Sequence, residues 1–206
     1  MINLKQTLTD SQAVLETAGI SHGLIGCLAL AIYGQHRATL DVDFLADGTK
    51  KDLIKSSFLS NGWQLKSESP EVLRFSGVGA VNVLLANRPL SQQMLRYVTK
   101  NPELGVMVAR PEDIIGLKIQ AYTNDDSRVI QEKADIQKLL QRPNLDATLL
   151  KQYAELFNQW PEIERMMGTS INKTMEEYFR FVDKYWQMFK PPTENKKLKN
   201  YSSFLL

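Results

Sequence analysis

The spacing of apolar residues predicts a helix, a strand and a second helix at the start of the chain. Over residues 3–18 leucines recur at helical intervals, as on one face of an amphipathic helix. Residues 21–26 are short and increasingly apolar, which is typical of a buried strand. Residues 27–33, CLALAIY, then predict a short apolar helix that stops at Gly34.

Residues 40–45, LDVDFL, show the clearest strand pattern. Side chains alternate between the two faces of a strand, so Leu40, Val42 and Phe44 should share one face. Asp41 and Asp43 should then both leave the opposite face. This segment predicts a strand with an apolar side toward a core and an acidic side away from it.

Four more strands and six more helices are expected. An amphipathic helix should cover residues 50–61, and strands are expected over residues 63–66, 72–75, 80–85 and 106–109. After Pro111, which suits the first turn of a helix, only helical patterns follow. Those helices are expected over residues 111–123, 127–141, 146–158, 160–167 and 172–189. We therefore predict an α/β (α+β) core over residues 1–108, a helical region over 109–190 and a basic tail over 191–206.

Composition places the chain among ordinary globular proteins. Of its 206 residues 43% are hydrophobic and 23% are charged, which suffices for a core and argues against disorder. A formal net charge of +2 is too small to indicate nucleic-acid binding by bulk electrostatics, although a local basic patch stays open. A single cysteine, an N-terminus without a signal-peptide pattern and the lack of a long apolar run favour a cytoplasmic protein without a membrane segment.

Asp41 and Asp43 are the first candidates for chemistry. Two residues apart on a strand, their Cα atoms should lie about 6.6 Å apart, close enough for the carboxylates to converge on one or two cations. Mg²⁺ (or Mn²⁺) suits such a pair, with substrate phosphates completing its oxygen ligands. The alternative is a solvent-facing strand pattern without a ligand.

Gly26 lies where the expected first strand meets the following helix. A glycine there lets a phosphate group approach the backbone closely, and N–H groups at a helix start favour anions. The plainer reading is a turn glycine, which is compatible with this role.

The stretch GCLALAIYGQHRATLDVDF resembles the signature of the DNA polymerase β-like nucleotidyltransferase superfamily. In its fuller form it is similar to minimal nucleotidyltransferases related to the AbiEii toxin, and ARPEDIIGLKIQAYTNDDSRVIQEKADIQKLL is also similar to that group. The resemblance covers about residues 22–141. It implies a mixed sheet with flanking helices, metal ligation and catalysis by Asp41 and Asp43, and binding of a nucleotide. The nucleotide-binding residues that it implies are Gly26, Cys27, Arg37, Thr39, Lys118 and Asp135.

Two positions depart from the superfamily pattern. Cys27 stands where Gly or Ser is common, and a thiol is a poor hydrogen-bond donor to phosphate. Asn82 stands where many superfamily enzymes place a third carboxylate, and an amide cannot act as a base at pH 7. Either another group such as Asp47 serves as the base, or transfer is slow, or the protein only binds.

The remaining candidates have structural alternatives. Arg37 could bridge to a carboxylate instead of a phosphate, and Thr39 could support the loop. Lys118 could face solvent, and Asp135 could form a salt bridge, with Lys118 as a partner.

Three functions stay open from the sequence. The first is metal-dependent transfer of a nucleotidyl group from an NTP to an RNA (tRNA) or protein acceptor, as in the toxin of a toxin–antitoxin or phage-defence system with an antitoxin partner. The second is a degenerate transferase that binds nucleotide, RNA or a partner protein. The third is a structural or homodimer-forming module, for which the aromatic stripe in 172–189 could serve as a face.

Overall fold

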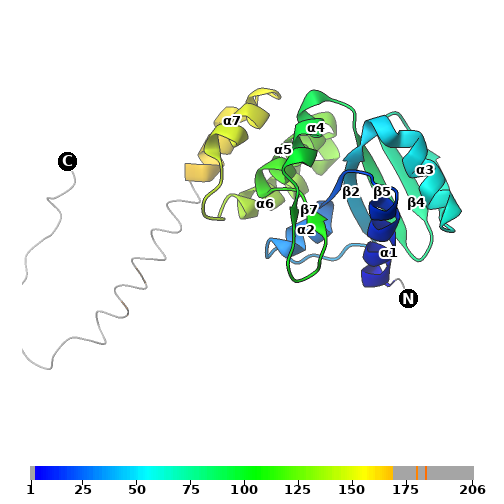
Figure 1. The fold of residues 1–206 in the computed structure, drawn as a ribbon. Coiled ribbons are helices and arrows are strands. Elements are labelled where there is room, and N and C mark those ends of the chain that lie inside the picture. Colours follow the sequence, from blue (N-terminus) through cyan, green and yellow to red (C-terminus); the bar gives the residue numbers. More distant parts are fainter. Residues whose placement is uncertain (1–2, 169–179, 181–183, 185–206) are drawn as a thin grey trace, which may run out of the picture.

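The computed structural model describes residues 3–168 together with residues 180 and 184. One seven-stranded mixed sheet forms the centre of the described part, with strand order β3-β4-β5-β2-β1-β7-β6 (Figure 1). The strands are β1 (His22–Ile25), β2 (Asp41–Asp47), β3 (Gln64–Glu68), β4 (Val72–Ser76), β5 (Ala80–Ala86), β6 (Thr99–Lys100) and β7 (Met107–Val108). A mixed sheet with flanking helices confirms the predicted fold class.

Helices flank the sheet and make up most of the described residues after Val108. In Figure 1, α5, α6 and α7 lie to one side of the sheet and α3 to the other. The α-helices are α1 (Leu4–Thr17), α2 (Gly26–Ile32), α3 (Lys51–Ser60), α4 (Pro89–Arg96), α5 (Pro111–Asn124), α6 (Val129–Leu139) and α7 (Ala147–Glu155). Two 3-10 turns, η1 (Gly48–Lys50) and η2 (Asp126–Arg128), precede α3 and α6, and residues 160–168 are also helical.

The expected elements are present in the described residues, within a few residues of the predicted bounds. Two elements were missed by the sequence pattern: α4 and the two-residue strand β6. Leu40 was assigned to the apolar face of the acidic strand, and this was wrong, because β2 begins one residue later and Leu40 is 71% exposed. The predicted helix 172–189 and the tail 191–206 lie outside the described residues, apart from residues 180 and 184.

The two faces of the sheet differ sharply in chemistry. Val42 and Phe44 are fully buried on one face of β2, as their alternation predicts. On the same face the ring of Phe75 from β4 stacks on Phe58 of α3, with centroids 4.3 Å apart. This apolar layer fixes β2 in the sheet, so the alternate residues of β2 must point to the opposite face.

The helical part packs closely on itself. A Cβ atom added at Gly116 of α5 would lie 2.8 Å from the ring of Tyr153 of α7, so glycine permits this close approach. The Tyr153 hydroxyl donates to Asp113 at 2.5 Å, and Asp113 also accepts from Arg110 at 2.9 Å. None of the described helices is long and apolar enough to cross a membrane.

Candidate active site

The acidic face of β2 meets an amide from the neighbouring strand. In the parallel pairing of β2 with β5, Asp43 lies directly opposite Asn82. Asn82 Nδ2 donates to Asp41 Oδ2 and to Asp43 Oδ1, both at 2.9 Å. The two carboxylates therefore share one face and converge within reach of a single side chain, as the strand spacing predicts.

Gly26 lies directly against this carboxylate pair. Its φ is +66°, and a Cβ atom added there would lie 2.1 Å from Asp43 Oδ2. Only glycine combines this backbone conformation with the absence of a side chain. The strand-to-helix turn at β1–α2 thus brings bare backbone next to the acidic strand, where any other residue would displace Asp43.

The loop before β2 orients one carboxylate. Thr39 Oγ1 donates to Asp41 Oδ1 at 2.7 Å, so Asp41 accepts hydrogen bonds from Thr39 and from Asn82. Thr39 therefore does more than support the loop backbone, because it fixes the rotamer of a carboxylate that the sequence singled out.

Lys118 and Asp135 belong to a group of charged side chains between α5, α6 and the loop before β2. Lys118 is only 8% exposed, and its Nζ donates to Glu132 at 2.6 Å and to Asp135 at 2.8 Å. Arg37 Nη1 donates to the same oxygen of Asp135 at 2.9 Å, and Arg128 pairs with Glu132. We call this group the buried ion cluster; its members are Arg37, Lys118, Arg128, Glu132 and Asp135.

The buried ion cluster shows which ion pairs these side chains form in this structure. Arg37 does bridge to a carboxylate, Asp135 does pair with Lys118, and Lys118 does not face solvent. Glu132 was not among the residues predicted from the sequence. Its spacing of three residues from Asp135 puts both on one face of α6, and this signal could have revealed it.

Burial and the two negative charges shape the acidity of the site. Burial is the largest cause that raises the pKa of Asp43, to about 6, and the negative charge of Asp41 acts in the same direction. The hydrogen bond from the Asn82 amide and the positive charges of Lys118 and Arg128 act to lower the pKa. The buried ion cluster thus contributes positive charge to the carboxylates without forming an ion pair with them.

A divalent cation fits this donor set. Asp41 and Asp43 supply carboxylate oxygens on one face, and hard cations such as Mg²⁺ are often held by two protein carboxylates together with substrate oxygens. The amide of Asn82 now spans the pair through its N–H₂ group, and rotation of the amide would present Oδ1 instead. Within the described residues no group of three His, Cys, Asp or Glu side chains could hold a metal ion, so such a site depends on Asn82 or the substrate.

Asp47 cannot take the part of the absent third carboxylate. It ends β2, four residues beyond Asp43, which corresponds to about 13 Å along a strand. Its Oδ1 accepts hydrogen bonds from Thr49 and Gln92 at the far end of the sheet. The suggestion that Asp47 acts as the base was therefore wrong, because the strand direction carries it away from the pair.

A cavity of about 450 Å³ lies over the carboxylate pair. Its volume falls within the range of small-molecule sites, roughly 300–1,000 Å³. The cavity brings together seven of the eight residues that the sequence proposed for catalysis and nucleotide binding: Gly26, Cys27, Arg37, Thr39, Asp41, Asp43 and Lys118. Asp135 is not in its lining but reaches it through Lys118 and Arg37.

No family model matches the chain, and no curated protein matches it either. Solved structures do share its fold. ANT(2'')-Ia in complex with adenylyl-2''-tobramycin gives a TM-score of 0.55 at 12% identity, over 75% of this chain and 96% of that one. The solution structure of the antibiotic-resistance factor ANT(2'')-Ia gives 0.50 at 12% identity, over 86% of this chain and 97% of that one.

A nucleotidyltransferase-like protein from Paracoccidioides brasiliensis is also similar, with a TM-score of 0.48 at 18% identity, over 80% of this chain and 91% of that one. At identities this low the likeness of the ANT(2'')-Ia structures concerns the fold alone. The chain has the nucleotidyltransferase fold.

Proposed function

We propose that this protein is a metal-dependent nucleotidyltransferase that moves a nucleotidyl group from an NTP to an acceptor. The observation that carries the proposal is the carboxylate pair Asp41–Asp43, converging on one point with the bare backbone of Gly26 against it. A nucleotidyl donor needs cations beside its phosphates and a wall that its phosphates can approach closely. The fold shared with ANT(2'')-Ia agrees with this proposal.

Each residue then has a defined part. Asp41 and Asp43 would hold Mg²⁺ or Mn²⁺, which supplies charge stabilisation at the phosphoryl oxygens. Thr39 donates to Asp41 and would hold its carboxylate in position for that cation. Gly26 and the backbone at Cys27 leave room for the phosphates, while Lys118 and Arg37 provide positive charge along the cavity wall.

Lys118 and Arg37 can bind a nucleotide only by dividing their positive charge between the nucleotide and Asp135. Both donate to Asp135, so a triphosphate would compete with Asp135 for them. Because the buried ion cluster has three cationic and two anionic members, one positive charge remains for an anionic ligand. We therefore propose that Lys118, Arg37 and Asp135 take part in nucleotide binding together, through a rearrangement of the buried ion cluster.

The acceptor and the biological setting extend the proposal. By its resemblance to the nucleotidyltransferases related to the AbiEii toxin, the chain would act in the cytoplasm on RNA such as tRNA, or on a protein. It would then serve as the toxin of a toxin–antitoxin or phage-defence system and have an antitoxin partner. A homodimer is a further part of this proposal.

The second candidate is a degenerate transferase that binds nucleotide, RNA or a partner without chemistry. One observation favours it: Asn82 occupies the register position opposite Asp43, and its amide donates to both carboxylates where a third carboxylate would accept a proton. An acceptor hydroxyl would then have to lose its proton to water.

The test is transfer of label from each α-³²P-labelled NTP, with Mg²⁺ or Mn²⁺, to total tRNA, to a cell lysate and to small hydroxylated compounds. We expect label in a macromolecule or a small product with wild type, none with Asp41→Ala, and wild-type levels with Asp52→Ala, an exposed carboxylate on α3. An increase with Asn82→Asp would identify the missing base. Nucleotide binding without transfer would support the degenerate binder. Absence of both nucleotide binding and transfer would refute both candidate functions.

A further inference from the structure

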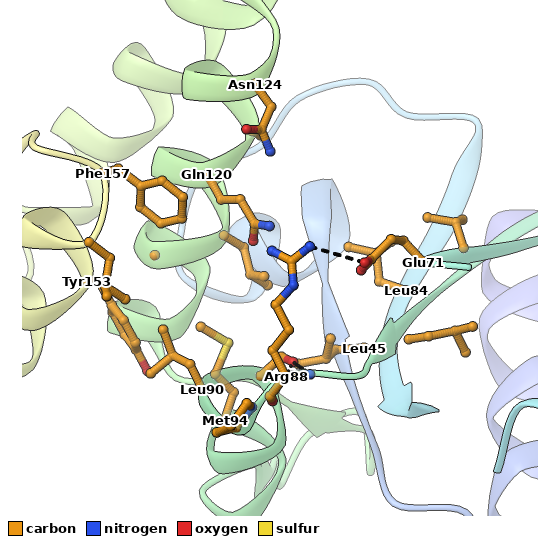
Figure 2. Close-up of a pocket in the computed structure, with 18 of the residues that line it drawn as sticks. Leu45, Glu71, Leu84, Arg88, Leu90, Met94, Gln120, Asn124, Tyr153 and Phe157 are labelled. Carbon is orange, nitrogen blue, oxygen red and sulfur yellow. Dashed lines mark hydrogen bonds and ion pairs between the residues drawn. The ribbon is translucent and has the colours of Figure 1, made fainter. Parts of the chain in front are cut away.

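A second, larger cavity adjoins the carboxylate site. Its volume is about 710 Å³, and it lies between β5, α4, α5 and α7. Figure 2 shows Tyr153 and Phe157 on one side, Leu84 and Glu71 on the opposite side, and Gln120 pointing into the space between them. We call it the α4–α7 cavity. Neither the sequence pattern nor the proposed chemistry assigns it a ligand.

Strand register places the α4–α7 cavity next to the reacting centre. Asn82 and Asp43 form one row across the sheet, and Leu84 and Leu45 form the next row on the same face. The two rows are about 6.6 Å apart along the strands. The polar row lies under the carboxylate site and the apolar row under the α4–α7 cavity. A molecule bound in the α4–α7 cavity can therefore reach the carboxylate site.

The two cavities also share wall residues. Both are lined by Val72, Leu84, Leu117, Ala121 and Arg128. On α5 the side chains of Ile114 and Lys118 line only the carboxylate cavity, whereas Gln120 and Asn124 line only the α4–α7 cavity. One helix thus forms a continuous wall along both.

Charge limits the occupant. The ionisable lining consists of two arginines, Arg88 and Arg128, and two acids, Glu71 and Asp125, so their formal charges sum to zero. Arg88 donates to Glu71 at 3.1 Å, and Arg128 pairs with Glu132. Neither a polyanion such as RNA nor a polycation finds an excess of opposite charge here.

Most of the wall is apolar, and the polar remainder can recognise a hydroxyl group. Tyr153 and Met94 are buried at the wall, and Leu156 at the rim is 62% exposed. Gln120 and Asn124 add amide groups, which donate and accept hydrogen bonds. An apolar pocket with a few polar groups is typical of a site for a drug-sized molecule.

We infer that the α4–α7 cavity binds the acceptor, and that this acceptor is an uncharged small molecule with an apolar ring or chain and a hydroxyl group directed at the carboxylate row. The inference rests on the proposed transfer reaction, and it names a small molecule in place of the RNA or protein acceptor that the resemblance suggests. In the reaction the hydroxyl oxygen forms a bond to the α-phosphorus of the NTP. The bond from that phosphorus to the oxygen bridging to the β-phosphorus breaks, pyrophosphate leaves with the electron pair, and the hydroxyl proton passes to water.

The first test uses N-phenyl-1-naphthylamine, an uncharged apolar dye, in a fluorescence titration of the full chain. We expect binding at one site per chain, weakened at least tenfold by Gln120→Trp, which fills the cavity without touching the carboxylate cavity. Leu59→Trp on α3, at a side chain 45% exposed, is the matched control and should leave the affinity unchanged. Leu156→Glu provides a second variant at an exposed position should Gln120→Trp not fold.

Absence of dye binding, or equal binding by wild type and both cavity variants, would overturn the inference. Coverage of the cavity by another part of the chain or by a second copy would give that result. Displacement of the dye by tRNA or kanamycin at lower concentration than by 2-naphthaleneethanol would overturn the choice of an uncharged occupant.

A second titration, in the presence of ATP and Mg²⁺, separates this inference from the proposed function. Simultaneous binding of dye and nucleotide is expected for neighbouring subsites, and mutual exclusion would show that the cavity belongs to the nucleotide. Nucleotide binding without dye binding would refute the acceptor site alone. Dye binding without nucleotide binding would refute the nucleotidyltransferase proposal, and with it the assignment of this cavity to an acceptor.

Discussion

Two groups of acidic side chains lie side by side in this protein, and they differ in how their negative charge is compensated. In the buried ion cluster, Glu132 and Asp135 each contact at least one cationic side chain within 3 Å. The carboxylates of Asp41 and Asp43 are instead bridged by the neutral amide of Asn82. The first group is compensated by ion pairs within the protein, whereas the second forms no ion pair in the described part of the chain and receives only the more distant charges of Lys118 and Arg128.

This difference separates scaffold from site. A buried charge needs a partner, and one that receives it from within the fold contributes to the structure. A pair of anions left on one face, beside a backbone without a side chain, is costly to the free protein and useful only when a cation binds. Four variants test this comparison, beginning with the largest expected effect.

Removal of one anion from the buried ion cluster should lower the free energy of unfolding more than any of the other variants. Asp135→Ala removes the anion that Lys118 and Arg37 share, but Lys118 keeps Glu132, so we expect a loss of about 3 kcal/mol, the lower end of the range for breaking a buried pair. Urea unfolding monitored by circular dichroism measures this loss of stability. The control Glu155→Ala removes the exposed pair with Lys151 and should cost at most about 0.5 kcal/mol. Similar losses for both variants would contradict a structural role for the cluster.

Removing one carboxylate of the pair should impair activity and spare the fold. In Asp41→Ala we expect transfer to fall at least ~100-fold, about 3 kcal/mol, because charge stabilisation by a metal contributes several kcal/mol. The midpoint of urea unfolding should stay at or above that of wild type, since one of two repelling anions is gone. A large loss of stability would place Asp41 with the scaffold instead.

The pKa of Asp43, raised to about 6 by burial, predicts a pH dependence with a definite sign. A raised folded-state pKa stabilises the protein fully below the unfolded value of 3.8, and this contribution is lost as pH rises through 6. In metal-free protein, Asp43→Asn should therefore gain about 2–3 kcal/mol relative to wild type at pH 7.5 and little at pH 4. Unfolding curves at both pH values check this.

The same shift affects metal binding. Because a cation competes with the proton on Asp43, Mn²⁺ affinity of wild type, measured by calorimetry, should weaken as pH falls below about 6. An affinity that does not change between pH 5 and pH 7.5 would show that Asp43 is not a ligand.

The smallest effect comes from two glycines. Gly26→Ala and Gly34→Ala both force a positive φ on alanine, at about 1–2 kcal/mol each. Only at Gly26 would the new Cβ meet Asp43, since nothing lies within 4 Å of the corresponding position at Gly34. Gly26→Ala should therefore lose more stability than Gly34→Ala, and it alone should lose nucleotide and Mn²⁺ affinity. Equal affinities would refute the role of Gly26 as a phosphate wall.

Much of this arrangement could be predicted because it is local in sequence. The alternation in residues 40–45 fixes the face of Asp41 and Asp43, and a glycine at a strand-to-helix junction predicts close backbone approach. The family resemblance marked Asn82 as the position of a third carboxylate, and the register of β2 with β5 places Asn82 opposite Asp43.

The rest depends on tertiary packing. The pairing of Lys118 with Glu132 joins two helices whose mutual orientation the sequence does not state. Helix α4 was missed because it is only eight residues long and follows β5 closely, although Leu90, Met94 and Leu95 do recur at helical spacing. The α4–α7 cavity needs both α4 and the closeness of α7 to α5, so no local pattern could reveal it.

The turn Gly77–Gly79 joins β4 to β5, and β5 in turn pairs with β2, where Asn82 stands opposite Asp43. A single-residue insertion here that was taken up by β5 would turn Asn82 into the layer of Phe58 and place a valine over the acidic strand. A two-residue insertion would return each β5 side chain to its own face but place Ala80 opposite Asp43. Only the native length of this turn should therefore keep the Asn82 amide against both carboxylates, and a library of turn lengths would lose that contact at any other length.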